Sequence, residues 1–179
     1  VFPHAKIEIS GEHGEILLPG EKGEILVHGK SRCLGYFVLL ESDGLRWEET
    51  EEVLRTRDLG SLQAGDEGLH VWGRMDDLII SGGEKVNPLE VRACIVEHPG
   101  VVDCVVAGIK DSEWGQIVVC LYQLKDEVDR SSVEIATLRA FLQSRLENYK
   151  IPKRWKQVYT LPYDEKGKLQ RKQLSAVLS

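Results

Sequence analysis

The stretch that decides the fold is Gly73-Arg-Met-Asp-Asp-Leu-Ile-Ile-Ser-Gly-Gly-Glu-Lys-Val-Asn-Pro-Leu-Glu90. Its centre, Leu78 to Ile80, is a short apolar run that leads into a Ser-Gly-Gly turn. Glycine suits such a turn because it adopts positive φ without a steric cost and leaves room near the backbone. Asn87 is a suitable helix N-cap, Pro88 suits the first helical position and Glu90 the third. The stretch therefore predicts a strand, a tight turn and the start of a helix.

The composition is typical of a globular protein. The chain has 179 residues, of which 42% are hydrophobic and 29% charged, enough for one large domain or two small ones. No apolar run approaches the roughly 20 residues of a membrane span. The N-terminus has no signal-peptide pattern and no starting Met, which is typical of an excised fragment. A net charge of -6 disfavours nucleic acid and anionic membrane as partners.

The cysteine spacing indicates neither a disulfide framework nor a zinc site. Cys33, Cys94, Cys104 and Cys120 form no C-x-x-C pair, and no histidine spacing completes a zinc site. Cys104 and Cys120 lie within apolar runs, which predicts buried thiols in a reducing cytosol. We therefore expect no metal bound by this chain and a cytoplasmic location.

Residues 1–75 are expected to be β-rich. Ala5, Ile7 and Ile9 alternate with polar residues, as in a half-buried strand. Further strands are expected at 15–18, 24–28, 45–47 and 69–72. Gly35 to Phe37 is expected to open a less regular region. Several short strands at this spacing predict part of a barrel or a bent sheet.

Residues 76–179 are expected to form a small mixed α+β domain. Four residues, Val91, Cys94, Ile95 and His98, have the spacing of one helix face. Two β-branched runs, 101–109 and 117–124, predict strands. A capping box at Ser131–Glu134 predicts a long amphipathic helix with a stripe at Ile135, Leu138, Leu142 and Leu146. A strand at 155–161 and a weak helix at 169–178 complete the domain, and the boundary is expected at Asp76.

Three segments of this chain resemble motifs of the AMP-forming acyl-CoA synthetases, members of the adenylate-forming superfamily. Residues 73–91, GRMDDLIISGGEKVNPLEV, closely resemble the family's hinge motif. TRDLG, from Thr56 to Gly60, is similar to the family's TGD-G motif, with Arg57 where Gly is common. LPYDEKGKLQRKQL, at 161–174, is similar to the segment that carries the family's catalytic lysine. The resemblance implies that 1–75 ends a large adenylating domain, within its β-barrel subdomain, and that 76–179 is the mobile C-terminal domain.

The family activates a carboxylic acid with ATP and Mg²⁺, releases pyrophosphate and passes the acyl group to CoA. The resemblance places the catalytic lysine at Lys168, which follows Gly167, and not at Lys166. A lysine there can neutralise charge that develops between the acid and the α-phosphate. The resemblance assigns Asp58 and Arg74 to nucleotide binding, Asp58 through the ribose hydroxyls.

The resemblance also assigns roles near the domain boundary. Asp76 becomes the hinge about which the small domain rotates between the two half-reactions. Gly82, Gly83 and Lys85 become part of the CoA channel. Trp114-Gly115-Gln116 is interpreted as structural. The alternative interpretations remain open. Asp58 can be a turn aspartate, and Arg74 can form a surface ion pair with Asp76 or Asp77. Lys85 and Lys168 can be solvated side chains.

Within the family, EHPGVVDCVVAGIKDSEWGQ and IPKRW look most like o-succinylbenzoate–CoA ligases of menaquinone and phylloquinone biosynthesis. The family's phosphate loop and acyl pocket are absent from this stretch, so we expect both to lie in a missing N-terminal domain and the fragment alone to be inactive. Two other functions remain open: an adenylation module that loads a carrier protein, and a non-catalytic interaction module.

Overall fold

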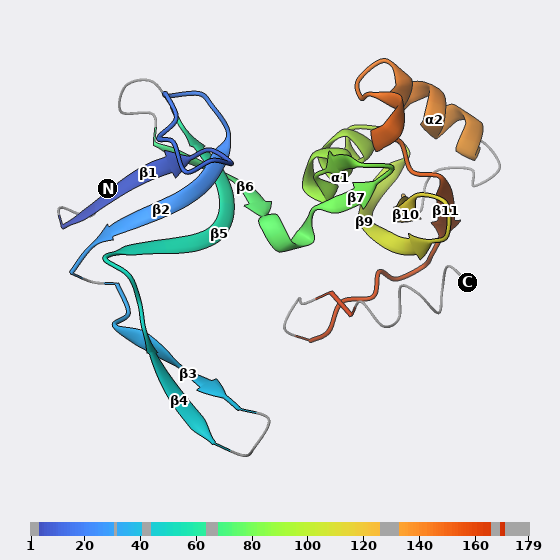
Figure 1. Cartoon of the computed structure of the whole chain (residues 1–179). Coiled ribbons are helices and arrows are strands. Elements are labelled where there is room, and N and C mark those ends of the chain that lie inside the picture. The colour runs from blue at the N-terminus through green and yellow to red at the C-terminus, as the bar shows by residue number, and fades with distance from the viewer. Residues whose placement is uncertain are drawn as a thin grey trace. The chain divides into compact units, whose positions relative to one another are not determined.

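The computed structural model of the chain describes residues 4–30, 32–40, 44–63, 68–125, 133–165 and 169–170. The chain divides into two compact units, Val1–Asp76 and Asp77–Ser179, which we call unit 1 and unit 2 (Figure 1). Strands dominate the described residues of both units, and the two α-helices described lie in unit 2. The α+β class predicted from the sequence is therefore confirmed.

Unit 1 is built on an antiparallel sheet of four strands. Their order along the sheet is β1 (Ala5–Ser10), β2 (Gly23–Gly29), β5 (Val53–Leu62) and β6 (Leu69–Arg74). Ile9 of β1 lies opposite Ile25 of β2, and both side chains are buried. Because successive strand residues point to opposite faces, the alternation predicted for β1 directs one apolar face toward this core.

Two predictions about unit 1 are wrong. Residues 15–18 form no strand: Ile16 makes one isolated bridge to Ser10, and Leu18 is 72% exposed. A strand is stabilised by packing its side chains on a half-buried surface, and this run leaves both of those side chains exposed. The region expected to be irregular instead forms β3 (Gly35–Leu39), which pairs with β4 (Leu45–Glu49).

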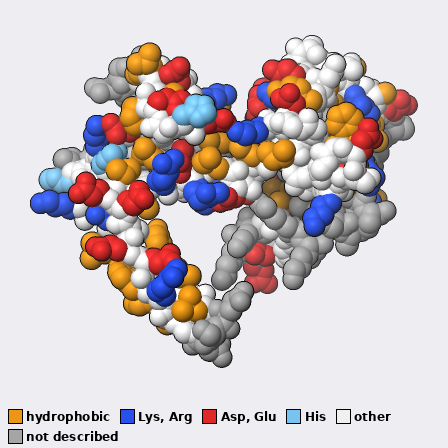
Figure 2. Space-filling model, in the orientation of Figure 1, with side chains coloured by type: hydrophobic (Ala, Val, Ile, Leu, Met, Phe, Trp, Pro, Cys, Tyr) orange, Lys and Arg blue, Asp and Glu red, His pale blue; other side chains and the backbone are white. Residues whose placement is uncertain are grey.

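The β3–β4 hairpin carries apolar side chains on its surface. The exposed ones on or beside it are Leu34, Tyr36, Phe37, Leu39, Leu40, Leu45 and Trp47. Figure 2 shows hydrophobic side chains along this ribbon. Phe37 and Trp47 lie opposite each other in the register, with ring centroids 5.0 Å apart in an edge-to-face arrangement. Such a cross-strand aromatic pair stabilises a ribbon of only two strands.

Unit 2 is built on a sheet of five strands. They are β7 (Ile79–Ser81), β8 (Glu84–Val86), β9 (Val101–Asp111), β10 (Gly115–Leu124) and β11 (Arg154–Gln157). β10 is central: it pairs antiparallel with β9 and β7 and parallel with β11. The sequence predicted the strand and tight turn of the β7–β8 hairpin and the separate strands β9 and β10, but not the pairing of β9 with β10. β11 ends at Gln157, earlier than the predicted strand at 155–161.

The core of unit 2 lies between this sheet and its helices. Val91 and Ile95 of α1 (Pro88–Val96) and Leu138 and Leu142 of α2 (Ile135–Gln143) are buried against the apolar residues of β9 and β10. Cys104 and Cys120 are completely buried in the same cluster as free thiols, as the apolar runs around them predicted. Burial of each such aliphatic side chain contributes about 1.5–3 kcal/mol.

The start of α1 follows the sequence prediction, but its end does not. Asn87 is the N-cap, and its side chain accepts a 2.9 Å hydrogen bond from the N–H of Leu89, with Pro88 at the first position. The helix ends at Val96, so His98 lies beyond the face predicted to include it. His98 Nδ1 accepts a hydrogen bond from the N–H of Gly100, and burial lowers its pKa.

The second helix begins later and ends sooner than predicted. Glu134, not Ser131, occupies the N-cap, and its side chain makes no capping hydrogen bond; Ser131 lies outside the described residues. α2 ends at Gln143, although Leu146 of the predicted stripe is still buried. The predicted C-terminal helix at 169–178 lies outside the described residues except for 169 and 170.

In the part of the chain that the structure describes, no helix has both the length and the apolar character needed to cross a membrane.

Candidate functional site

The two residues predicted to bind nucleotide lie side by side on β5 and β6. Asp58 and Arg74 are register partners across the antiparallel pair. Arg74 Nη1 lies 3.2 Å from Asp58 Oδ1, with 52% and 36% of the respective side chains exposed. Both groups are therefore paired with each other at the surface, and the second carboxylate oxygen of Asp58 can still accept hydrogen bonds.

A β-bulge positions Asp58. Between the register pairs Glu24–Leu59 and Leu26–Arg55, β2 contributes one residue and β5 contributes three. The Thr56 hydroxyl donates to the Ile25 carbonyl at 2.8 Å, and the N–H of Asp58 donates to the same hydroxyl oxygen at 3.0 Å. A bulge of this kind redirects the side chains of the longer strand.

Arg57 lies at the centre of this bulge with φ +60°. Among the described residues it is the only non-glycine with positive φ. Its N–H donates to Glu24 Oε1 at 3.1 Å, and the other carboxylate oxygen of Glu24 accepts two hydrogen bonds from Arg55 at 2.6 and 3.0 Å. The Glu24 side chain is only 7% exposed. Glu24 therefore holds the bulge in place through its hydrogen bonds to Arg55 and Arg57.

The guanidinium of Arg57 extends to Asp76, the last residue of unit 1. Its Nε lies 3.1 and 3.2 Å from the two carboxylate oxygens, and its Nη2 also contacts Oδ1. Arg74 Nη2 approaches Asp76 from a second direction, at 3.6 Å. Hydrogen bonding by Arg57, assisted by Arg74, holds the pKa of Asp76 below its ordinary value. Sequence reasoning missed Arg57; its only signal was the departure from glycine in TRDLG.

The structure therefore brings together Asp58, Arg74 and Asp76 in unit 1. The alternative interpretation of Arg74, an ion pair with Asp76 or Asp77, is accurate in part, because Arg74 contacts Asp76 as well as Asp58. Asp76 itself lies in a one-turn 3-10 helix, Met75–Asp77, which contains no buried residue.

The residues predicted for the CoA channel form a tight turn in unit 2. Gly82 and Gly83 have φ +60° and +87° and join β7 to β8 in a two-residue hairpin, while Lys85 lies opposite Ile80. A Cβ on Gly82 would lie 2.6 Å from Trp114 Cε3, whereas a Cβ on Gly83 would meet no atom within 4 Å. The turn is thus closed on one side and open on the other.

The segment Trp114-Gly115-Gln116 fastens this turn to β10. The N–H of Gly82 donates to the Trp114 carbonyl at 3.0 Å, and the N–H of Ile80 donates to Gln116 Oε1 at 2.8 Å. Lys153 lies over the Trp114 ring, with its ammonium 3.5 Å from the ring centroid. These contacts account for the structural role expected of the segment.

The predicted catalytic residue, Lys168, lies outside the described residues, as do Gly167 and Lys166. The structure describes both flanks. Tyr163 pairs with Leu169 in an isolated antiparallel bridge, and the N–H of Gln170 donates to the Pro162 carbonyl at 2.8 Å. The residues immediately before and after this segment are therefore held together.

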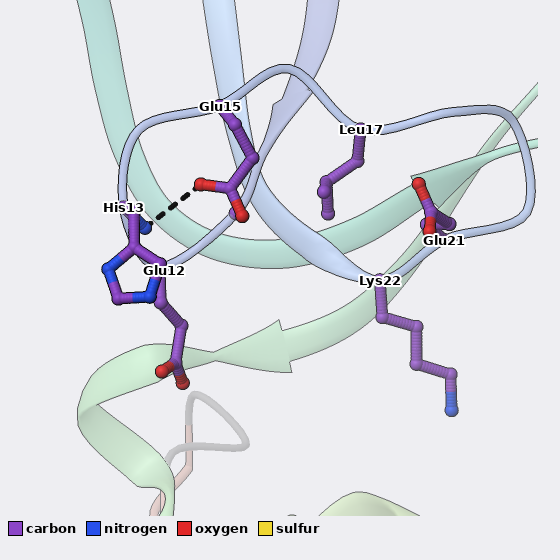
Figure 3. A pocket seen from close by; sticks show the side chains of 7 residues that line it. Glu12, His13, Glu15, Leu17, Glu21 and Lys22 are labelled. Carbon is purple, nitrogen blue, oxygen red and sulfur yellow. Dashed lines mark hydrogen bonds between the residues drawn. The ribbon is translucent and has the colours of Figure 1, made fainter.

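An open hollow of about 510 Å³ lies in unit 1, and none of the predicted site residues lines it. It is lined by Gly11, Glu12, His13, Glu15, Leu17, Glu21 and Lys22 (Figure 3). The N–H of His13 donates to Glu15 Oε2 at 3.0 Å across one end. Charged side chains at the surface dominate the lining, and none of them belongs to the motifs described above.

Residues 90–168, within unit 2, match the family described as the AMP-binding enzyme C-terminal domain. The chain therefore resembles this family over the greater part of unit 2. It is also similar to the 2-succinylbenzoate–CoA ligase of Geobacillus kaustophilus (strain HTA426), with 39% identity over 138 residues, 74% of this chain and 27% of that protein. The chain thus spans about a quarter of this relative's length.

Solved structures of adenylate-forming enzymes share the fold of this chain over both units. One is o-succinylbenzoate CoA synthetase from Bacillus subtilis in complex with its acyl-adenylate intermediate, at 32% identity and TM-score 0.74, covering 96% of this chain and 34% of that one. Another is the amide bond synthetase McbA from Marinactinospora thermotolerans, at 26% identity and TM-score 0.77, covering 99% and 35%.

Proposed function

We propose that this chain is the C-terminal portion of an AMP-forming acid–CoA ligase. The observation that supports this most strongly is the likeness to the o-succinylbenzoate CoA synthetase complex, which extends over 96% of the chain and so includes both units. In the proposed reaction a carboxylate oxygen attacks the α-phosphate of ATP and pyrophosphate leaves. The thiol of CoA then attacks the acyl carbon, and AMP leaves.

Unit 1 would contribute to nucleotide binding through Asp58 and Arg74. The bulge in β5 directs Asp58 outward, and the carboxylate can accept hydrogen bonds from two ribose hydroxyls. Arg74 already lies against one of its oxygens, so it would orient the carboxylate and present its remaining donors to the ribose or phosphate. Most of the contacts to ATP and its Mg²⁺ would come from a larger N-terminal domain.

Unit 2 would contribute a different surface to each half-reaction. In the first, Lys168 would neutralise the charge that builds up between the acid and the α-phosphate. In the second, the Gly82–Gly83 turn would line the path of the pantetheine arm, with Lys85 beside it on β8. The open side of Gly83, where an added Cβ meets no atom within 4 Å, allows a slender substrate to approach the backbone. Asp76, at the division between the units, would be the hinge.

We infer o-succinylbenzoate as the acid, from the 39% identity to a 2-succinylbenzoate–CoA ligase. The acyl pocket would lie outside this chain, so the chain alone would not adenylate any acid. A second candidate is a ligase with a different acyl acceptor, since the chain is also similar to an amide bond synthetase. An adenylation module that loads a carrier protein falls in the same class.

The test uses the full-length protein and assays each half-reaction. Pyrophosphate release is measured with ATP and a panel of aromatic and aliphatic acids, and acyl transfer is then measured with CoA, amines or a carrier protein. We expect release with o-succinylbenzoate and transfer to CoA. Transfer to amines or a carrier protein but not to CoA would favour the second candidate, and no acid-dependent release at all would support a non-catalytic module.

A further inference from the structure

The division between the two units falls in a segment with little packing of its own. The 3-10 turn Met75–Asp77 contains no buried residue, and the boundary lies between Asp76 and Asp77. A segment without buried apolar contacts reorients at low cost. Any contact that fastens this segment to one of the units therefore has a large influence on where the turn lies.

Arg57 makes such a contact from β5, nineteen positions away in the sequence. Its guanidinium binds both oxygens of the Asp76 carboxylate, and the planar fork of arginine matches the geometry of a carboxylate. Arg74, the last residue of β6, is farther away: its Nη2 lies 3.6 Å from Asp76 Oδ2. The Arg57 contact is thus the closer of the two ion pairs on Asp76.

The backbone at Arg57 indicates that this side chain has a specific role. A φ of +60° is unfavourable for an arginine and ordinary for glycine. The surrounding groups hold the conformation in place: Glu24 accepts the N–H of Arg57, and Thr56 bridges to Ile25. Backbone strain that the rest of the structure maintains points toward a function for the strained residue. Here its visible consequence is that the guanidinium reaches Asp76.

We propose that Arg57 is a positioning residue that fastens Asp76, and with it the segment between the two units, to β5. We call this contact the Arg57–Asp76 latch. Because the Asp76 side chain is part of this segment, the latch sets how readily the segment leaves the 3-10 turn described above. Its influence on the two half-reactions rests on the function proposed above, whereas the latch itself does not.

Arg57→Gly removes the side chain cleanly. Glycine accepts φ +60° without strain, and its N–H can still donate to Glu24, so the bulge should remain. Arg57→Lys keeps the charge but loses the bidentate geometry. Arg46→Ala is the matched control, because Arg46 is an exposed arginine of the same unit that pairs with Glu48 and lies on the β3–β4 hairpin. A charge exchange, Arg57→Asp with Asp76→Arg, tests whether the pairing itself matters.

Hydrogen–deuterium exchange on the full-length protein measures the latch directly. In Arg57→Gly, exchange of the peptide spanning residues 75–78 should rise by about two- to five-fold, the range expected for an exposed ion pair. Peptides of β1 and β2 should be unchanged. Exchange in the unmodified protein should rise with salt while the glycine variant responds little, because salt screens exposed charges. The Arg57→Lys variant and the charge exchange should restore protection in part, and the Arg46→Ala variant should match the unmodified protein.

Unchanged exchange at 75–78 in Arg57→Gly would overturn the latch, whatever the enzyme does. The rates of adenylation and acyl transfer are measured on the same variants, and we expect their ratio to change by at least about two-fold, in line with the loss of one exposed pair. Faster exchange with an unchanged ratio would support the latch and count against Asp76 as the hinge of the proposed enzyme.

Discussion

The ammonium of Lys150 donates a 2.8 Å hydrogen bond to Glu90 Oε1, across sixty positions of sequence. The same ammonium lies 2.9 Å from Glu147, and only 13% of the lysine side chain is exposed. The contact joins η2 (Asn148–Lys150) to the first turn of α1. Glu90 makes this tertiary contact from the third position of α1, the position predicted from the sequence.

Lys150→Met should destabilise unit 2 by about 1.5–3 kcal/mol, the range for a hydrogen bond to a charged group. Burial acts to lower the pKa of Lys150, but the two carboxylates outweigh it and the pKa is raised. The stabilisation that Lys150 gives to unit 2 is therefore fully present below the ordinary lysine pKa. It is lost as pH rises through the higher pKa that Lys150 has in the folded state. Exchange of the slowest β10 amides measures the free energy of opening. Lys6→Ala, which removes an exposed pair with Glu8, is the control and should leave those amides unaffected.

Gly82→Ala should be more damaging than Gly83→Ala. Both residues have positive φ, which costs an alanine about 1 kcal/mol, but only the Cβ at 82 would meet Trp114. The clash should add about 1–3 kcal/mol, and it should largely disappear in the Gly82→Ala/Trp114→Ala double variant. Exchange of the amides of β7 and β8 measures both effects. Equal losses for the two single variants would show that Trp114 does not confine the turn.

Lys168→Ala in the full-length protein should slow adenylation by about 100- to 1,000-fold, the usual effect of removing one charge-stabilising donor. Acyl transfer from pre-formed acyl-adenylate should be affected much less, because that step develops its charge elsewhere. Lys166→Ala is the control and should be mild. If both half-reactions slow equally, Lys168 is not the catalytic lysine.

Asp76→Pro should separate the two half-reactions. Proline disfavours helical geometry at the preceding residue, and Met75 belongs to the 3-10 turn, so the variant should disfavour this turn. We expect the ratio of adenylation to acyl transfer to change by orders of magnitude. Asp76→Ala keeps the backbone free and loses only the contacts with Arg57 and Arg74, so its effect should be a few-fold. The same ratio in both variants would mean that the chain does not turn at this residue.

Local signals in the sequence predicted the elements that depend on local physics. The cap at Asn87 and the Gly82–Gly83 hairpin require particular residue types at particular positions, and both are present as predicted. The two long strands β9 and β10 were predicted because their sequences are strongly apolar and rich in β-branched residues. Where strand formation depends on a distant partner, prediction failed: residues 15–18 have strand-like composition, yet Leu18 is 72% exposed.

The candidate site could be predicted residue by residue but not as a network. The TRDLG motif marked Asp58 and the hinge motif marked Arg74 and Asp76, but the proximity of Asp58 to Arg74 depends on the register of β5 against β6. The residue type at position 57 did not predict its conformation, because residue propensities give no reason to expect an arginine at φ +60°. The bulge that places it there depends on Glu24, thirty-three positions earlier.

The anchoring of the β7–β8 turn has a consequence for binding. Gln116 holds Ile80 on one side, and the Trp114 carbonyl holds Gly82 on the other. The conformational entropy of this turn is therefore lost when unit 2 folds, and little remains to be lost when a substrate arrives. In the proposed enzyme a thiol-bearing arm would meet a preorganised surface, so ordering of this turn would not reduce the affinity.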